Sequence, residues 1–379
     1  MSTDRINVGL VGLGFGAEFI PIYLNHPNVA TITLCDPDPE RLAKWGDLYG
    51  VERRTAALDA LLADPEIDAV HLVTPIPLHA EQALAALEAG KHCACTVPMA
   101  TNLADLRAIV DARRRSGKQY MMMETAVYCR EFLYAQELVA QGVIGRIQLL
   151  RGCHYQDMEG WPPYWRGLPP FWYGTHALAP LLALAKTRAR EVHCLGSGVM
   201  REELVRPYGN PYPIETAILR LEGSDVAAEA TRSLFHLAHE YQEAFNVYGD
   251  EGVFEWAQVQ GEGPVLFRIE ALDEAGRRGR RTTAERLTVP DYAHRLPREI
   301  QRFTQRGVYD ESAPHLSFLQ GGGHGGSHPH LVHEFVSSIV EGRSPAVDAV
   351  TAADWCAAGI CAHESAMRGG EGVHVPSFA

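Results

Sequence analysis

The chain has few cysteines, no excess of basic residues and no long apolar run. Its eight cysteines among 379 residues form no Cys-x-x-Cys pair, a pattern that favours a reduced cytosolic protein. Lys plus Arg number 34 against 47 Asp plus Glu, so the formal net charge is −13. This acidity disfavours general binding to nucleic acid or to an anionic membrane. No window reaches the roughly 18 apolar residues that a membrane helix needs. We therefore expect a cytoplasmic protein without nucleic-acid or membrane partners.

The apolar content is ordinary for a globular protein, and the length fits two domains or one large one. In the first third, short apolar runs alternate with helical patterns, which is typical of parallel strands joined by right-handed helical crossovers. The predicted strands are Ile6–Val11, Thr31–Cys35, Ala69–Val73, His92–Cys95 and Gln119–Met123, and the predicted helices are Ala17–Leu24, Pro39–Tyr49, Leu78–Ala89 and Leu103–Arg115.

The first predicted strand runs into a glycine-rich turn, Gly12-Leu13-Gly14-Phe15-Gly16-Ala17, which fits Gly-x-Gly-x-x-Ala. Glycines in such a turn let backbone N–H groups approach a pyrophosphate at a helix N-terminus. Asp36 ends the second strand, near the spacing at which a carboxylate binds the adenosine ribose. We interpret this as a dinucleotide site rather than a purely structural turn. Asp36 would repel a 2′-phosphate and so favours NAD over NADP, a preference that Arg41 could soften.

After about residue 146, alternating apolar residues dominate. The predicted strands are Ile147–Arg151, Val192–Ser197, Thr216–Leu221, Val226–Thr231, Ala244–Tyr248 and Gly252–Val259. They indicate a mainly antiparallel sheet with hairpin connections. The polar and basic stretch 261–307 is expected to form an exposed excursion. We therefore predict an α/β chain with an NAD-binding domain over residues 1–125 and a substrate-binding α+β domain over 126–379, with an open sheet and a C-terminal helix.

Three further motifs carry a family resemblance: Thr74-Pro75-Ile76-Pro77-Leu78-His79, Ala89-Gly90-Lys91-His92 and Cys95-Thr96-Val97-Pro98-Met99-Ala100. With the glycine turn and Gly342-Arg343-Ser344-Pro345, they resemble the glucose-fructose oxidoreductase, inositol dehydrogenase and rhizopine-catabolism (Gfo/Idh/MocA) family. The resemblance implies a Rossmann doubly wound sheet followed by an open sheet that carries a sugar site, and often a homo-oligomer. It implies that the cofactor contacts Thr74, Pro75, His79, Thr96, Val97 and Glu124.

One departure changes the expected chemistry. Typical sugar dehydrogenases of this family have Glu-Lys-Pro where this chain has Thr96-Val97-Pro98, and valine cannot take a proton from a sugar hydroxyl. A Val-Pro here resembles the NAD-dependent glycosidase branch, glycoside hydrolase family 109. The segments Met121–Tyr128, Tyr173-Gly174-Thr175-His176 and Gly323-His324-Gly325-Gly326 resemble motifs of the same branch, with Gly174 in place of its Pro and His154 in place of its Tyr.

That branch implies cleavage through transient oxidation at C3 of the sugar, elimination across C1 and C2, water addition and re-reduction by bound NAD. Histidine suits the proton transfers, because its ordinary pKa lies near neutrality. We expect His176 or Tyr173 to take the C3 hydroxyl proton, and His154 and His324 to be further proton carriers. His324 lies in a glycine-rich loop, so a purely structural or mobile role is the alternative. Glu124 is a candidate carboxylate at the nicotinamide; the alternative is a strand-end residue satisfied by solvent.

Between His154 and His176 lies an aromatic, proline-rich segment, 161–173. Flat aromatic faces with polar edges match a pyranose ring, so the predicted sugar contacts are Trp161, Tyr164, Trp165 and Trp172. The alternative is a loop that covers the core or a subunit interface.

The histidines near the end of the chain also raise the question of a metal ion. His328, His330 and His333 cluster, and His236 and His239 form a pair, but no metal motif accompanies them. We expect no metal ion, and a helix that begins near Ser327 as its cap. The leading functional prediction is a glycoside-cleaving enzyme that keeps its NAD bound. The alternatives are a sugar dehydrogenase that exchanges NAD and, less favoured, a non-catalytic sugar or NAD sensor.

Overall fold

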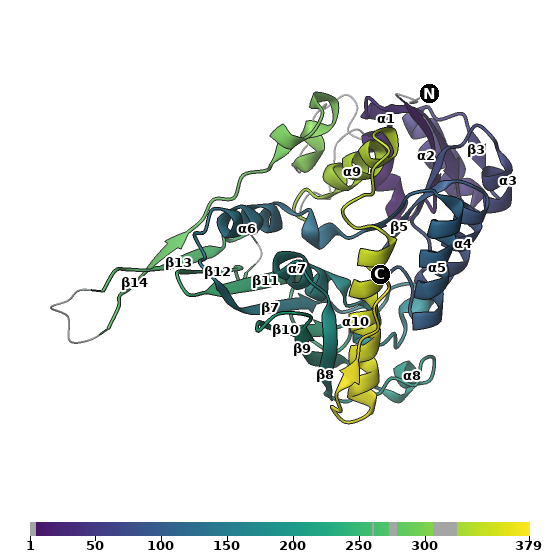
Figure 1. Ribbon diagram of the computed structural model, residues 1–379. Coiled ribbons are helices and arrows are strands. Elements are labelled where there is room, and N and C mark those ends of the chain that lie inside the picture. The colour runs from purple at the N-terminus through teal and green to yellow at the C-terminus, as the bar shows by residue number, and fades with distance from the viewer. Residues whose placement is uncertain (1–4, 260, 273–278, 306–323) are drawn as a thin grey trace. The chain divides into compact units, whose positions relative to one another are not determined.

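The computed structural model describes residues 5–259, 261–272, 279–305 and 324–379, and the chain forms two compact units (Figure 1). The first unit contains Met1–Tyr128, Asp291–Cys356 and Ser377–Ala379, and the second contains Cys129–Pro290 and Ala357–Pro376. The first boundary thus lies close to the predicted one at residue 125. The second domain was predicted as the continuous range 126–379. The structure differs from this prediction, because Asp291–Cys356 belongs to the first unit.

Apolar packing explains why this later segment joins the first unit. Ile300, Phe303 and Phe335 are fully buried in the same hydrophobic core as Ile20 and Ile22. They lie in the 3-10 helix η7 (Arg298–Thr304) and in α9 (His328–Val340), both of which pack against α1 (Ile20–Asn25). The predicted exposed excursion over 261–307 is therefore wrong for its last part, where burying these side chains stabilises the first unit.

The first unit contains a parallel sheet with strand order β3-β2-β1-β4-β5-β6, which confirms the Rossmann doubly wound fold. Its strands are β1 (Ile6–Val11), β2 (Val29–Cys35), β3 (Arg54–Thr55), β4 (Ala69–Leu72), β5 (His92–Thr96) and β6 (Tyr120–Met123). Its further helices are α2 (Pro39–Tyr49), α3 (Leu58–Ala63), α4 (His79–Glu88) and α5 (Leu103–Ser116). The sequence pattern missed β3 and α3, which are too short to show a clear period.

The helix predicted over 17–24 differs in type. Residues Phe15–Phe19 form a 3-10 helix, η1, and the α-helix begins only at Ile20. Pro21 lies in the first turn of α1, where its fixed φ and missing N–H suit a helix start. The glycine turn therefore leads into a 3-10 turn rather than directly into an α-helix.

The second unit contains a mixed, mostly antiparallel sheet, as predicted, with strand order β14-β13-β12-β11-β7-β10-β9-β8-β15. The strands are β7 (Ile147–Tyr155), β8 (Ala189–Ser197), β9 (Ile214–Leu221), β10 (Ala227–Ser233), β11 (Gln242–Gly249), β12 (Gly252–Glu255), β13 (Val265–Ile269), β14 (Thr282–Arg286) and β15 (Val373–His374). Among the strands of this sheet that the structure describes, only β10 and β7 pair in parallel. The helices α6 (Arg130–Ala140), α7 (Thr175–Ala185) and α8 (Glu202–Val205) also lie in this unit, and α10 (Ala349–Met367) contributes residues to both.

One face of this sheet is covered by α7, which contacts β7, β10 and β11 (Figure 1). The contact is close because β7 has a glycine on that face: a Cβ added to Gly152 would lie 2.2 Å from the carbonyl oxygen of Ala177. The backbone of α7 thus lies directly on the sheet. The residues at the start of α7 are thereby held near the end of β7.

Within the described ranges, no helix combines the length and the apolar character needed to cross a membrane.

We expect Gly152→Ala to lower the free energy of unfolding by about 1–3 kcal/mol, because the added methyl group pushes against the α7 backbone. Thermal melting followed by circular dichroism measures the loss. Arg151→Ala, on the opposite and exposed face of β7, is the matched control and should change stability by less than about 1 kcal/mol. Equal stability of Gly152→Ala and the wild type would contradict the tight contact.

Candidate functional site

The predicted cofactor residues gather at one edge of the first sheet. Each follows the carboxyl end of a parallel strand, namely Gly12 to Ala17 after β1, Asp36 after β2, Thr74 and Pro75 after β4, Val97 after β5 and Glu124 after β6. Carboxyl ends of parallel strands meet at the same edge, and the strand order reverses between β1 and β4. Ligands of doubly wound sheets bind at this place.

The glycine turn has the backbone that a phosphate cradle requires. Gly12 has a φ of +87°, and a Cβ there would lie 2.3 Å from the carbonyl oxygen of Val73. Gly14 and Phe15 are exposed, so the turn is open to a ligand at these two residues. The residues present therefore fit a dinucleotide.

Asp36 is almost fully buried and organises the same edge. One carboxylate oxygen accepts a hydrogen bond from the backbone N–H of Leu13 at 2.6 Å, and the other accepts from Asp38 N–H at 2.9 Å. A carboxylate has further acceptor capacity for ribose hydroxyls. The guanidinium of Arg41 lies 3.9 Å from Asp36 and half its side chain is exposed, which is consistent with a secondary role at the ribose.

His79 connects two of these loops. Its ring nitrogens lie 2.8 Å from the Thr74 carbonyl oxygen and 2.7 Å from that of Pro98. Burial lowers the pKa of His79, although both carbonyls oppose the shift. The neighbouring Thr96 hydroxyl donates to the Leu72 carbonyl at 3.3 Å, and Val97 is buried. His79 thus fixes the loops that would hold the cofactor, and the position of the usual lysine is apolar.

Glu124 and His324 both belong to the first unit. Glu124 is fully buried and its carboxylate accepts from Ala126 N–H at 3.0 Å, capping the 3-10 helix η3 (Thr125–Val127). The solvent-satisfied alternative for Glu124 is therefore wrong. The His324 ring lies 6.1 Å from the Phe15 ring of the glycine turn and 5.4 Å from that of His328. The glycines 321–323 before it lie outside the described residues.

The helix predicted near Ser327 is α9, which begins at His328. Ser327 holds the cap position, but its side chain makes no capping hydrogen bond, so the predicted cap is wrong in that detail. Pro329 in the first turn lacks an N–H and reduces the need for a cap.

In the second unit, four polar residues form a row across neighbouring strands. Strand pairing places Glu215 of β9 opposite Arg232 of β10, Arg232 opposite His154 of β7, and His154 opposite Glu243 of β11. Paired residues share a face of a sheet, and this is the face that α7 covers. The start of α7 adds His176 to the row.

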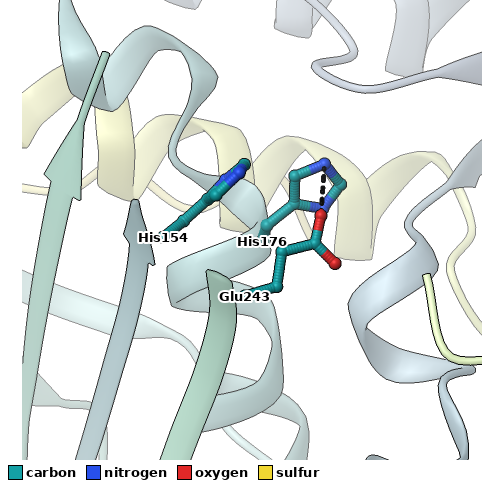
Figure 2. A group of neighbouring side chains, drawn as sticks. All are labelled: His154, His176 and Glu243. Carbon is teal, nitrogen blue, oxygen red and sulfur yellow. Dashed lines mark ion pairs between the residues drawn. The ribbon is translucent and has the colours of Figure 1, made fainter. Parts of the chain in front are cut away.

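His154, His176 and Glu243 come together at the end of β7 (Figure 2). Nε2 of His176 lies 3.5 Å from Oε1 of Glu243 and 3.2 Å from the Tyr173 hydroxyl. The rings of His154 and His176 are 5.0 Å apart. Two of the predicted proton carriers and Tyr173 thus form one buried cluster, with a carboxylate that can hold the His176 imidazole in place.

Arg232 binds the backbone of two residues of this cluster, Tyr173 and His154. Its side chain is fully buried, and its guanidinium donates to the carbonyl oxygens of Tyr173 at 2.8 Å, of His154 at 3.0 Å and of Ser233. It also donates to Gln156 Oε1 at 3.2 Å. Burial lowers the pKa of Arg232 to about 10, so the group remains charged at neutral pH.

Three members of the cluster were missed by sequence reasoning: Arg232, Tyr241 and Glu243. The Tyr241 hydroxyl donates to Glu243, and burial together with the Glu243 charge raises the Tyr241 pKa. A signal existed, because these residues alternate with period two beside buried apolar residues of their own strands. The predicted strands ended at Thr231 and began at Ala244, just short of them.

The predicted aromatic contacts divide into two groups. The buried Trp165 ring lies 4.8 Å from Tyr173 and contacts the rings of Tyr164 and Trp161. Trp172 instead packs against other rings of the second unit, those of Tyr208 and His363. Tyr164 and Trp161 are thus continuous with the histidine cluster through Trp165.

Comparison with known proteins gives this geometry a context. Residues 6–124 match the Gfo/Idh/MocA model, described as an oxidoreductase family with an NAD-binding Rossmann fold. The chain is 30% identical over 200 residues to a glycosyl hydrolase family 109 protein of Porphyromonas gingivalis, covering 48% of this chain and 43% of that protein. The match thus spans less than half of that relative.

A second kind of relative is named a dehydrogenase. The chain is 27% identical over 318 residues to a levoglucosan dehydrogenase of Pseudarthrobacter phenanthrenivorans, covering 74% of this chain and 80% of that protein. The structure of a levoglucosan dehydrogenase in complex with NADH and levoglucosan has a TM-score of 0.72 and 24% identity, covering 98% of this chain and 100% of that one. This likeness confirms the fold class.

We expect Asp36→Asn to weaken NAD binding about tenfold and to reduce the preference for NAD over NADP, because a charged acceptor is lost and a 2′-phosphate is no longer repelled. Fluorescence titration with both cofactors measures the change. Asp38→Asn is the matched control, since asparagine caps α2 as well as aspartate does. Unchanged cofactor affinities in Asp36→Asn would remove Asp36 from the ribose site.

Proposed function

We propose that the chain is an NAD-dependent enzyme that cleaves glycosides through transient oxidation at C3 of the sugar. The match of residues 6–124 to the NAD-binding Rossmann model of the Gfo/Idh/MocA oxidoreductase family supports this proposal. One observation carries the proposal. The position of the family's usual lysine is the buried Val97, whereas the second unit has a Tyr173–His176–Glu243 cluster suited to proton transfer.

NAD, when bound at the edge of the first sheet, supplies a hydride acceptor for the first step and returns the hydride in the last. The chain's own residues handle the protons. The Tyr173 and His176 pair receives the proton of the C3 hydroxyl, and Glu243 stabilises the imidazolium that forms. Arg232 holds the backbone at His154 and Tyr173.

The ketone at C3 acidifies the hydrogen at C2, so a base of ordinary strength can remove it. We assign this to His154 or His324, because an imidazole nitrogen is the kind of base that such a step needs. The electron pair of the C2–H bond then forms a double bond as the C1 substituent leaves. Water adds across that bond and C3 is reduced again, so the sum is hydrolysis without net oxidation.

The alternative is a dehydrogenase that releases NADH after oxidising a free sugar or an anhydrosugar. The similarity to levoglucosan dehydrogenase over 74% of the chain favours this candidate. The two functions share the first proton transfer and differ in whether C1 loses its substituent and whether NADH leaves.

The experiment gives the purified chain a panel of chromogenic α- and β-glycosides in deuterated water without added cofactor. Release of the chromophore with deuterium at C2 of the sugar supports elimination, because the C2 hydrogen exchanges with solvent. Release without deuterium contradicts it. In a second arm with added NAD and free sugars, stoichiometric NADH formation, without chromophore release in the first arm, assigns the dehydrogenase instead.

We expect His176→Gln to lower kcat about a hundredfold or more, and Tyr173→Phe to lower it by a smaller factor, since each loses part of the proton path. Tyr155→Phe is the matched control, because Tyr155 lies on the opposite face of β7. Full activity of His176→Gln would exclude this cluster from the reaction.

We also propose a homo-oligomer that associates through the outward face of the second sheet. Leu195 of β8 and Ile218 of β9 are 61% and 55% exposed on neighbouring strands, which marks an apolar region on that face. Sedimentation of the wild type should give an oligomer that Leu195→Lys with Ile218→Lys dissociates. Val199→Lys, at an exposed valine outside the strands, is the control. A monomeric wild type would contradict the proposal.

A further inference from the structure

We propose that His154, His176 and Glu243 bind one divalent transition-metal ion, with Zn²⁺ as the ion to test. Two imidazole nitrogens and one carboxylate oxygen form the donor set that catalytic zinc sites use when they leave a fourth position open. The sequence pattern favoured no metal ion for the histidines near the end of the chain, and it did not single out these three residues, which lie far apart along the chain and match no metal motif.

The distances suit a small ion. The three ligand atoms all lie within 4.8 Å of one another, and Nε2 of His176 is 3.5 Å from Oε1 of Glu243. Two ligands at tetrahedral positions around Zn²⁺ lie about 3.4 Å apart, given bonds of roughly 2.0–2.2 Å. The pair already has this spacing, and a ring nitrogen of His154 lies within 4.8 Å of both atoms.

The scaffold holds the three ligands on separate rigid elements. His154 and Glu243 lie directly opposite each other on β7 and β11, and His176 is in the first turn of α7. The close contact at Gly152 fixes α7 on β7. His154 and His176 are 0% and 2% exposed, so little water competes for their nitrogens.

Neighbouring side chains complete the site. Tyr241 donates its hydroxyl proton to Oε1 of Glu243, as outer partners of ligating carboxylates do. The Tyr173 hydroxyl lies 3.2 Å from Nε2 of His176. This hydroxyl is therefore close to the fourth position, where a water molecule or a substrate oxygen would bind.

Two charged side chains near the proposed site have opposite effects on the binding of a cation. The Arg232 guanidinium lies 5.2 Å from the Tyr173 ring centre and opposes a second cation, while Glu243 favours one. All four guanidinium hydrogen bonds described above are to neutral oxygen atoms, although the Glu243 charge also acts on the guanidinium. The same positive field favours loss of a proton from a water or hydroxyl at the fourth position.

The metal site itself is independent of the reaction, whereas its role rests on the proposed function. If the oxygen of a sugar hydroxyl occupied the fourth coordination position of the ion, the ion would lower the pKa of that hydroxyl. With Nε2 of His176 bound to the ion, His176 no longer takes this proton, which instead leaves through the Tyr173 hydroxyl as that hydroxyl passes its own proton to solvent. His154 is then also a ligand, so the base at C2 is His324. The ion supplies the activation that the missing lysine provides elsewhere in the family.

The test uses the full chain, stripped with a chelator and dialysed, without substrate. We expect one equivalent of Zn²⁺ to bind, measured by elemental analysis after gel filtration, and Co²⁺ to give the visible absorption of a four-coordinate site. His154→Ala and Glu243→Gln should each weaken Zn²⁺ binding by tenfold or more. Circular dichroism checks that both variants are folded.

The matched control is His193→Ala, because His193 also pairs with a carboxylate. Its Nε2 lies 2.9 Å from Oε1 of Glu191 on the exposed side of β8. It should bind Zn²⁺ as the wild type does. A wild type that retains no Zn²⁺, or binds it no more tightly than folded Glu243→Gln, overturns the proposal.

The readouts separate this proposal from the proposed function. If the chain binds Zn²⁺ through these residues and cleaves no glycoside, the metal site stands and the proposed reaction fails. If the stripped enzyme cleaves glycosides at the full rate and binds no ion, the reaction stands and the metal site fails.

Discussion

The arrangement of the second unit depends on one buried cation, the guanidinium of Arg232. Moving a charged group from water into the protein interior costs free energy unless polar groups surround it there. Here the cost is offset by hydrogen bonds to the carbonyl oxygens of His154, Tyr173 and Ser233 and to the side chain of Gln156. These bonds join the end of β7 to the segment that precedes α7. The same contacts that solvate the charge therefore determine where the two candidate proton carriers lie.

The geometry around Arg232 gives a physical meaning to the missing lysine. In the first unit, the loop after β5 carries Val97, which is buried and cannot ionise. In the second unit, His176 lies between a tyrosine hydroxyl and a carboxylate. An imidazole in such a setting has a ring nitrogen that can bind a proton or a metal ion, whereas a lysine there would add a second cation beside Arg232. The chain thus has its titratable chemistry on the sheet rather than on the Rossmann loop.

Much of the fold could be predicted from the sequence. The first five apolar runs became β1, β2, β4, β5 and β6, because apolar strands flanked by helical periods leave little choice of topology. The return of Asp291–Cys356 to the first unit could not be predicted, because the polar and basic stretch that contains Ile300 indicated an exposed excursion, and no local pattern shows which core Phe335 joins.

For the candidate site, residue type indicated His154, His176 and Tyr173, because histidine and tyrosine suit proton transfer in any fold. The role of Glu243, Tyr241 and Arg232 could not be read in the same way. Charged and polar residues near strand ends are usually solvated, and only burial by α7 makes them a cluster. Glu124 shows the reverse case, since its full burial as a helix cap distinguishes it from the solvent-exposed alternative.

The sequence by itself determined the alternation of elements, the glycine turn with Asp36 and the loss of the lysine, because these are local patterns with local physical causes. Only the tertiary structure decided which distant residues meet. Strand register placed Arg232, His154 and Glu243 in one row, and the absence of a side chain at Gly152 let α7 bring His176 to it. Register and close packing depend on contacts between segments far apart in the chain, and no local pattern encodes them.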